Sequence, residues 1–292
     1  MDLERTNIVK IVGRLTDCDI KTGNRKSDGM GYVSVTASVT SDINGEDNQF
    51  DVSFYAFQST KDGKENSLYG TYLTMNELIG KKVQIDGSMS ENRFYSAKQE
   101  KMVSSQRLNG RFIKGVSEQT HDEATFELGG FIMKTLAEKT NKAGEVYAYE
   151  LALGQCNYSG NAMSMLTVQI NPNDREIVMG AKNYKIAQTV KVYGNLHWIT
   201  TQVSQKSDNV GGFGEAPVRV FTNHQRNFFM TGGTAPETAP LAYDTAIINS
   251  LIETYKAKDK QVELEAKNRA NSGSAAPVST EAPITQRQTS LI

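Results

Sequence analysis

"VQIDGSM", residues 83–89, and "VKVYGNL", residues 190–196, repeat one short pattern within a chain of 292 residues. Each reads Val, any residue, Ile or Val, any residue, Gly, a small polar residue, and then Met or Leu. Alternating apolar residues predict a half-buried strand, and the glycines Gly87 and Gly194 predict a sharp bend within it. A motif that recurs in each half of a chain indicates either chance or two copies of one domain.

The first part of the chain, which contains the first copy of the motif, favours strands and one helix. "YVSVTASV" (32–39) and "FDVSFYAF" (50–57) alternate apolar with other residues, as half-buried strands do. "SLYGTYLTMNELIG" (67–80) loses that alternation and ends on a glycine, which predicts a short helix with a glycine stop. "KKVQIDGSM" (81–89) and "RFYSAK" (93–98) predict two further strands.

The second half repeats this order of elements, which makes a duplication of the whole domain the better explanation. Residues 126–137 correspond to 7–17, residues 146–153 to the second strand and residues 163–170 to the third. Residues 174–188 correspond to the helix, and residues 190–198 and 218–224 to the last two strands. Three strands, a helix and two strands follow one another in the OB-fold, a five-stranded Greek-key barrel. The fold expected is therefore mainly β, with two tandem OB-fold barrels. The alternative is another two-domain β protein in which the helix is misassigned.

The composition changes after the second set of strands. Gly, Thr, Ala and Pro predict a linker, apolar residues at helical spacing (Ile247, Ile248, Leu251) predict a helix, and the last residues show no period. The predicted organisation is OB-fold domain 1 at 1–116, OB-fold domain 2 at 117–231, a linker at 232–240, a C-terminal helix at 241–270 and a disordered tail at 271–292. The helix could pair with a second chain, pack on a barrel or hold a partner protein.

The sequence offers no motif for catalysis. It contains no phosphate-binding loop and no G-x-S-x-G nucleophile turn, and its two cysteines and three histidines are too scattered to predict a metal site. We therefore expect neither an enzyme nor a cofactor. No apolar run approaches the roughly 20 residues of a membrane span. The charged start "MDLERTNIVKIVG" is unlike a signal peptide, so we expect a cytoplasmic protein.

Charge and aromatic residues favour nucleic acid. The net charge is −1, yet residues 81–115 and 182–226 each carry more basic than acidic residues. Aromatic rings accompany these cations, a combination that suits unpaired strands because bases stack on rings while Lys and Arg hold phosphates. The candidate nucleic-acid-binding residues are Tyr32, Tyr55, Phe57, Lys81, Lys82, Arg93, Phe94, Tyr95, Lys98, Arg107, Arg111, Lys191, Tyr193, His197, Trp198, Arg219 and Arg226.

The run "NIVKIVGRLTD…YVSVTASV…FDVSFYAF…KKVQIDGSM" resembles the bacterial and phage single-stranded DNA-binding proteins, over residues 7–98 and more loosely over 126–224. The resemblance implies a protein that coats single-stranded DNA in replication or recombination. We interpret it as phage-encoded, and a phage protein would act in the host cytoplasm. It implies stacking by the rings at Tyr32, Tyr55, Phe57, Tyr193 and Trp198.

Three departures from the family limit what the resemblance implies. Two barrels in one chain suggest a monomer or dimer in place of four single-barrel chains. The end "QRQTSLI" lacks the acidic tip through which the family recruits partners. The helix at 241–270 has no counterpart, so replication or recombination proteins that bind this helix or the tail are a further expectation.

Two other functions stay open at this point. An OB-fold protein can be a structural or adaptor protein in a viral assembly, in which case the rings would meet a protein. It can also be an RNA-binding or recombination mediator protein, because the same rings stack on RNA bases. The residues alone do not decide whether both barrels bind.

Overall fold

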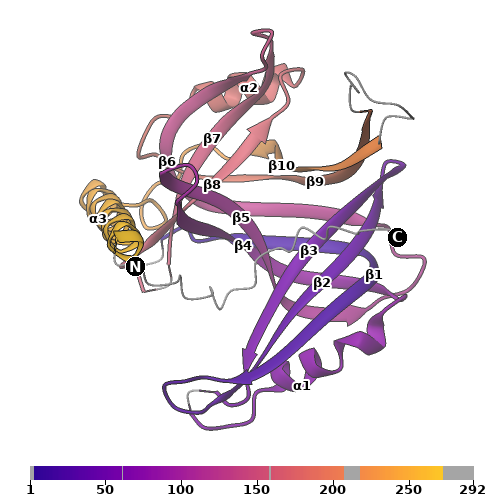
Figure 1. Ribbon diagram of the computed structural model, residues 1–292. Coiled ribbons are helices and arrows are strands. Elements are labelled where there is room, and N and C mark those ends of the chain that lie inside the picture. The colour runs from indigo at the N-terminus through magenta and orange to yellow at the C-terminus, as the bar shows by residue number, and fades with distance from the viewer. Residues whose placement is uncertain (1–2, 61, 158, 207–217, 272–292) are drawn as a thin grey trace, which may run out of the picture.

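The computed structural model describes residues 3–60, 62–157, 159–206 and 218–271, and it contains two β-barrels and a long C-terminal helix (Figure 1). Barrel 1 comprises β1 (Asn7–Asn24), β2 (Gly31–Ile43), β3 (Glu46–Phe57), α1 (Ser67–Leu73), the 3-10 helix η1 (Met75–Leu78), β4 (Lys82–Ser96) and β5 (Lys101–Gly115). Barrel 2 comprises β6 (Glu123–Thr140), β7 (Val146–Cys156), β8 (Met163–Ile170), α2 (Arg175–Lys182), β9 (Thr189–Lys206) and β10 (Val218–Gly233). The last element is α3 (Thr245–Asn271).

Both barrels have the same strand pairing. In barrel 1 the order is β2-β3-β5-β4-β1, closed by β1 pairing with β2. In barrel 2 the order is β7-β8-β10-β9 with β6 pairing to both β7 and β9. The contact of the third strand with the fifth is parallel in each barrel, and the other ladders are antiparallel. The predicted mainly β fold of two five-stranded OB barrels followed by a helix is confirmed.

The repeated glycine of the opening motif has the same function in each barrel. A Cβ atom on Gly87 would lie 2.1 Å from the carbonyl oxygen of Asn109 in β5. A Cβ atom on Gly194 would lie 1.9 Å from the carbonyl oxygen of Phe229 in β10. The fourth and fifth strands approach each other closely next to a β-bulge in both cases, and only glycine leaves room for that approach.

Replacing either glycine with alanine is expected to destabilise the protein by about 1–3 kcal/mol, because a backbone oxygen cannot move aside as a flexible side chain could. Urea unfolding of Gly87→Ala and Gly194→Ala measures the effect. The control is Gly70→Ala in α1, where an added Cβ meets nothing within 4 Å and the helix gains roughly 0.4–1 kcal/mol. Equal stabilities for all three variants would contradict this explanation of the motif.

The two barrels join through an antiparallel ladder between β1 and β6, centred on the pair Val9–Phe126. Gly13 lies four residues after Val9, and Gly130 lies four residues after Phe126. A Cβ atom added to either glycine would lie 2.4 Å from a carbonyl oxygen of the next strand. The ladder therefore pairs equivalent positions, and the barrels are related by an approximate twofold axis. Ten strands consequently form one continuous sheet.

The two predicted helices occupy the expected places between the third and fourth strands. The side chain of Asn66 caps α1 by accepting the backbone N–H of Leu68 at 3.1 Å. Gly80, at φ +82°, follows η1 and turns the chain into β4. Tyr72 of α1 is buried, and its hydroxyl donates to the carbonyl of Arg111 at 2.7 Å. These contacts fix α1 against barrel 1.

One prediction of the strands is wrong. Residues 93–96 are the end of β4, residues 97 and 98 lie in the turn that follows, and the true fifth strand, β5, begins at Lys101. The β4–β5 pair extends well beyond barrel 1 as a long hairpin, here called the β4–β5 arm (residues 90–107). Its polar sequence lacks a clear apolar alternation because much of it lies outside a barrel core.

The first turns of α3 pack on barrel 2. Ile248 and Leu251 are buried in a small apolar cluster with Phe131 and Tyr243, apart from the main core that runs through both barrels. Of the three possibilities for this helix, packing on a barrel is the one that the structure contains. Along the described part of the chain, no helix has the length and apolar character that crossing a membrane requires.

Candidate nucleic-acid interface

Three aromatic rings gather on the outer surface of β2 and β3, at the end of barrel 1. Tyr55 is 52% exposed and stacks on Tyr32, with ring centroids 5.6 Å apart and planes inclined by 24°. Phe57 meets Tyr55 edge to face at 5.1 Å. The guanidinium of Arg25 lies over the Phe57 ring at 4.6 Å. We call these four residues the β2–β3 ring cluster.

The local sequence explains the position of these rings. Val33 and Val35 in β2, like Phe54 and Ala56 in β3, point into the core, so the alternate residues must point out. The apolar alternation that builds barrel 1 thus also presents the rings to solvent. Tyr32, Tyr55 and Phe57 lie on the strand faces opposite the core, as predicted, with Tyr55 exposed and the other two half-buried.

The loop between β1 and β2 places the cation of the cluster. The Nε atom of Arg25 donates to a carboxylate oxygen of Asp28 at 2.8 Å, and the same carboxylate accepts the backbone N–H of Met30 at 3.2 Å. The hydrogen bond from Arg25 lowers the pKa of Asp28 to about 2. Nε and one Nη of Arg25 both pair with the Asp28 carboxylate, so this ion pair holds the guanidinium beside the Phe57 ring and neutralises its charge.

Three of the predicted cations are held in ion pairs within the protein. Lys82 pairs with Asp122 at 2.5 Å, and Arg226 pairs with Asp51 at 3.0 Å across the two barrels. Arg93, on the β4–β5 arm, pairs with an aspartate of α3. Since each cation is already neutralised, we do not assign these side chains to phosphate binding.

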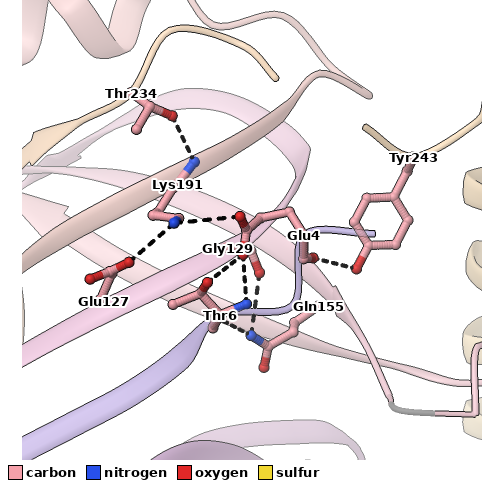
Figure 2. A network of polar contacts seen from close by, with 8 residues as sticks. All are labelled: Glu4, Thr6, Glu127, Gly129, Gln155, Lys191, Thr234 and Tyr243. Atoms are coloured by element: carbon pink, nitrogen blue, oxygen red, sulfur yellow. Dashed lines mark hydrogen bonds and ion pairs between the residues drawn. The ribbon is translucent and has the colours of Figure 1, made fainter. Parts of the chain in front are cut away.

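Lys191 belongs to a network that ties the N-terminus to barrel 2 (Figure 2). Its ammonium lies 3.6 Å from the buried carboxylate of Glu4 and 3.3 Å from Glu127. Glu4 also accepts the backbone N–H of Thr6 at 2.8 Å, and its carbonyl accepts the hydroxyl of Tyr243 at 2.8 Å. The network joins the N-terminus, β9 and the segment before α3, which gives Lys191 a structural function.

The Glu4 carboxylate makes the stability of this network depend on pH. Burial alone raises the pKa of Glu4, but the hydrogen bonds from Thr6 and the charge of Lys191 outweigh burial and lower it below its ordinary value of 4.5. Because the pKa of Glu4 is lower in the folded protein, its charged carboxylate stabilises the fold fully at pH values above the ordinary pKa. This stabilisation is lost as the pH falls through the pKa of the folded protein.

Glu4→Gln removes a charged hydrogen-bonding partner and should therefore cost about 1.5–3 kcal/mol at pH 7, and progressively less as the pH falls below the ordinary value of 4.5. Urea unfolding of the wild type and the variant at pH 7 and at a series of values below 4.5 measures this difference. Glu118→Gln, which alters an exposed pair with Arg14, serves as the control and should change stability by less than about 1 kcal/mol. The same loss for Glu4→Gln at every pH tested would contradict the assignment.

The expected solvent exposure of Trp198 is wrong. Its side chain is only 3% exposed, with its ring 5.7 Å from Phe50 of barrel 1 and 6.0 Å from Phe228 of β10. Its neighbour His197 is half-buried, and its Nε2 lies 3.0 Å from a carboxylate oxygen of Glu46. Trp198 therefore forms part of the packing between the barrels and is not available for stacking.

The remaining predicted residues are spread over other surfaces. Phe94 and Tyr193 are exposed rings, on the β4–β5 arm and on β9 respectively. The side chain of Arg219 is not among those that the structure describes. Exposed cations occur at Lys81, Lys98 and Arg111, whereas Tyr95 and Arg107 on the arm are half-buried. The structure thus brings Tyr32, Tyr55 and Phe57 together at the surface, and it brings Arg226 over the buried Trp198 ring between the barrels.

Sequence reasoning missed Arg25. Arg25 directly precedes the turn into β2, and a cation just before a strand with outward rings was the available signal. Tyr147 of β7 is 57% exposed but belongs to barrel 2, outside the β2–β3 ring cluster. Within the described residues, no three His, Cys, Asp or Glu side chains come together as metal ligands.

Two OB barrels joined in one sheet, with one ring cluster on an open strand face, define the class of this protein as a tandem OB-fold protein. A family model described as YorF matches residues 5–269, so the chain belongs to the YorF family. The comparison with curated protein sequences gives no match.

The fold is similar to that of solved structures. The wild-type single-stranded DNA-binding protein from Thermus aquaticus aligns with a TM-score of 0.50 at 15% identity, over 83% of this chain and 98% of its own. A deletion mutant of that protein gives 0.50 at 14% identity, over 81% and 98%. At these identities the likeness concerns the fold.

Proposed function

We propose that this protein binds single-stranded DNA without a catalytic step, by stacking bases on the β2–β3 ring cluster. The observation that carries the proposal is the exposed stack of Tyr32 on Tyr55 with Phe57 and Arg25 beside it. Stacking on exposed rings suits every base. Duplex DNA hides the faces of its bases and cannot use such a cluster.

The similarity in fold to single-stranded DNA-binding proteins supports this choice over an adaptor function. The matching strand pairing and matching glycines of the barrels support an origin by tandem duplication. A function in coating strands during replication or recombination, in a phage-infected cytoplasm, is the biological setting that we propose. Monomers or dimers are sufficient for it, since one chain already contains two barrels.

Fluorescence anisotropy with labelled oligo-dT of about 30 nucleotides tests the proposal, with a duplex and an oligo-U of equal length alongside. We expect tight binding to oligo-dT, much weaker binding to the duplex, and a loss of affinity as salt rises because phosphate contacts release counterions. Preference for oligo-U would move the assignment to RNA. Absence of binding to every strand at low salt would refute it and favour a protein partner.

A further inference from the structure

The ring cluster of barrel 1 has no counterpart in barrel 2. Ser53 of β3 pairs with Asn109 of β5, and Gln169 of β8 pairs with Phe229 of β10. Asn109 and Phe229 are equivalent because their carbonyl oxygens cover the two motif glycines. Ser53 and Gln169 are therefore equivalent positions, which sets the register for comparing the two faces.

In this register the two ring positions on β3 correspond to asparagines. Tyr55 lies two residues beyond Ser53, and the residue two beyond Gln169 is Asn171. Phe57 likewise corresponds to Asn173. Strand β8 ends at Ile170, whereas β3 continues to Phe57, so barrel 2 lacks both the rings and the strand that would carry them.

Helix α3 covers the outer surface of β7 and β8. Cys156 and Met163 pair across these strands and point out of the barrel, yet they are only 4% and 9% exposed. They form the apolar cluster with Ile248 and Leu251 of α3, each 2% exposed. Apolar side chains on an outer strand face require such a cover, and α3 provides it.

The β4–β5 arm closes the next part of the same face. The side-chain amide of Gln106 donates to the carbonyl of Thr167 at 2.9 Å and accepts the Thr167 N–H at 2.7 Å, as a neighbouring strand would do. A carboxylate oxygen of Glu91 accepts the N–H of Met165 at 2.9 Å. The N–H of Met165 and the N–H and carbonyl of Thr167 are therefore already bonded to the arm.

The arm and α3 also hold each other. The Tyr255 hydroxyl donates to Glu91 at 2.6 Å. Arg93 pairs with Asp259, and its guanidinium lies 4.1 Å from the centre of the Tyr255 ring. Figure 1 shows α3 at the left of the molecule, beside barrel 2. Opening this face would break an apolar cluster and a charged network together.

We infer that the chain presents one single-strand face, the β2–β3 ring cluster of barrel 1. Barrel 2 has no such cluster on its equivalent strands, β7 and β8, and uses the hairpin end of their outer surface to seat α3, with the β4–β5 arm along β8. This inference rests on the proposed function. It assigns different tasks to two barrels of the same topology: barrel 1 contacts the bases, and barrel 2 anchors α3.

A matched pair of tyrosines tests the inference. Tyr147 of barrel 2 and Tyr55 of barrel 1 are similarly exposed, at 57% and 52%. Within the described residues Tyr147 has no aromatic ring packed against it, whereas Tyr55 stacks between two rings. We expect Tyr55→Ala to weaken oligo-dT binding at least fivefold and Tyr147→Ala by less than twofold. Equal losses would overturn the single-face assignment, whereas a wild type that binds no oligo-dT would refute the proposed function itself.

The thiol of Cys156 gives a second and independent readout. In a Cys18→Ser background, Cys156 is the remaining cysteine, and it lies beneath α3. Its rate of reaction with an aromatic disulfide reagent should be slow and unchanged when oligo-dT saturates the protein. A rate that rises severalfold with oligo-dT would show that single strands displace α3 from barrel 2, and this would overturn the inference.

Discussion

Tyr55→Ala is expected to weaken binding to oligo-dT by about 5- to 150-fold, which corresponds to the roughly 1–3 kcal/mol of one base stacked on an aromatic ring. Tyr55 occupies the centre of the β2–β3 ring cluster, with Tyr32 on one side and Phe57 on the other. Its removal takes away one stacking ring and leaves the other two without their common neighbour. Anisotropy titrations at fixed salt measure the loss.

Two further variants identify the physical origin of that loss. Tyr55→Phe keeps the ring and should retain affinity within about threefold, because stacking needs the ring and not the hydroxyl. Phe112→Ala removes a ring of similar exposure from β5, outside the cluster, and should have a much smaller effect. If Tyr55→Phe binds as weakly as Tyr55→Ala, a hydrogen bond and not stacking is the source of affinity.

Trp198→Ala should destabilise the fold by about 3–5 kcal/mol, the usual cost of deleting a buried aromatic side chain. Trp198 packs against Phe50 and Phe228, lies under the guanidinium of Arg226, and uses its backbone N–H to bond the Asn48 side chain at 2.8 Å. It therefore stabilises the contact between the barrels as well as barrel 2. Urea unfolding followed by circular dichroism measures the loss.

Circular dichroism is needed because Trp198 is the only tryptophan in the chain, so the variant has no tryptophan fluorescence. Trp198→Phe retains most of the buried ring and is the matched control, with an expected loss below that of the alanine variant. A stability of Trp198→Ala within about 1 kcal/mol of the wild type would contradict the buried position of this side chain.

Local patterns in the sequence were sufficient to predict much of the fold. The repeated glycine motif, the alternating strands and the glycine after η1 all express constraints between neighbouring residues or adjacent strands. The boundary between β4 and β5 could not be predicted in the same way. The β4–β5 arm leaves barrel 1 and gains its partners from β8 and α3, which are distant in the sequence.

The candidate site was predictable where alternation alone determines exposure. Tyr32, Tyr55 and Phe57 alternate with core residues, and they face outward as expected. In "VKVYGNLHW" the same alternation places Trp198 with Leu196 and Val192 on the inner face. The sequence-based prediction instead grouped Trp198 with its neighbour His197 as a binding residue. Ion pairs of Lys82 and Lys191 involve partners far away in the chain, and no local pattern reveals them.

Photo-crosslinking of the full chain to an oligo-dU substituted with 5-iodouracil tests directly whether single-stranded DNA stacks on the β2–β3 ring cluster. Mass spectrometry of the crosslinked peptides identifies the residues that react. Halogenated bases react with the aromatic rings on which they stack, so the crosslinks report the stacking surface. We predict crosslinks at Tyr32, Tyr55 or Phe57 in barrel 1. Crosslinks confined to barrel 2 would contradict the central claim that single-stranded DNA lies on the β2–β3 ring cluster.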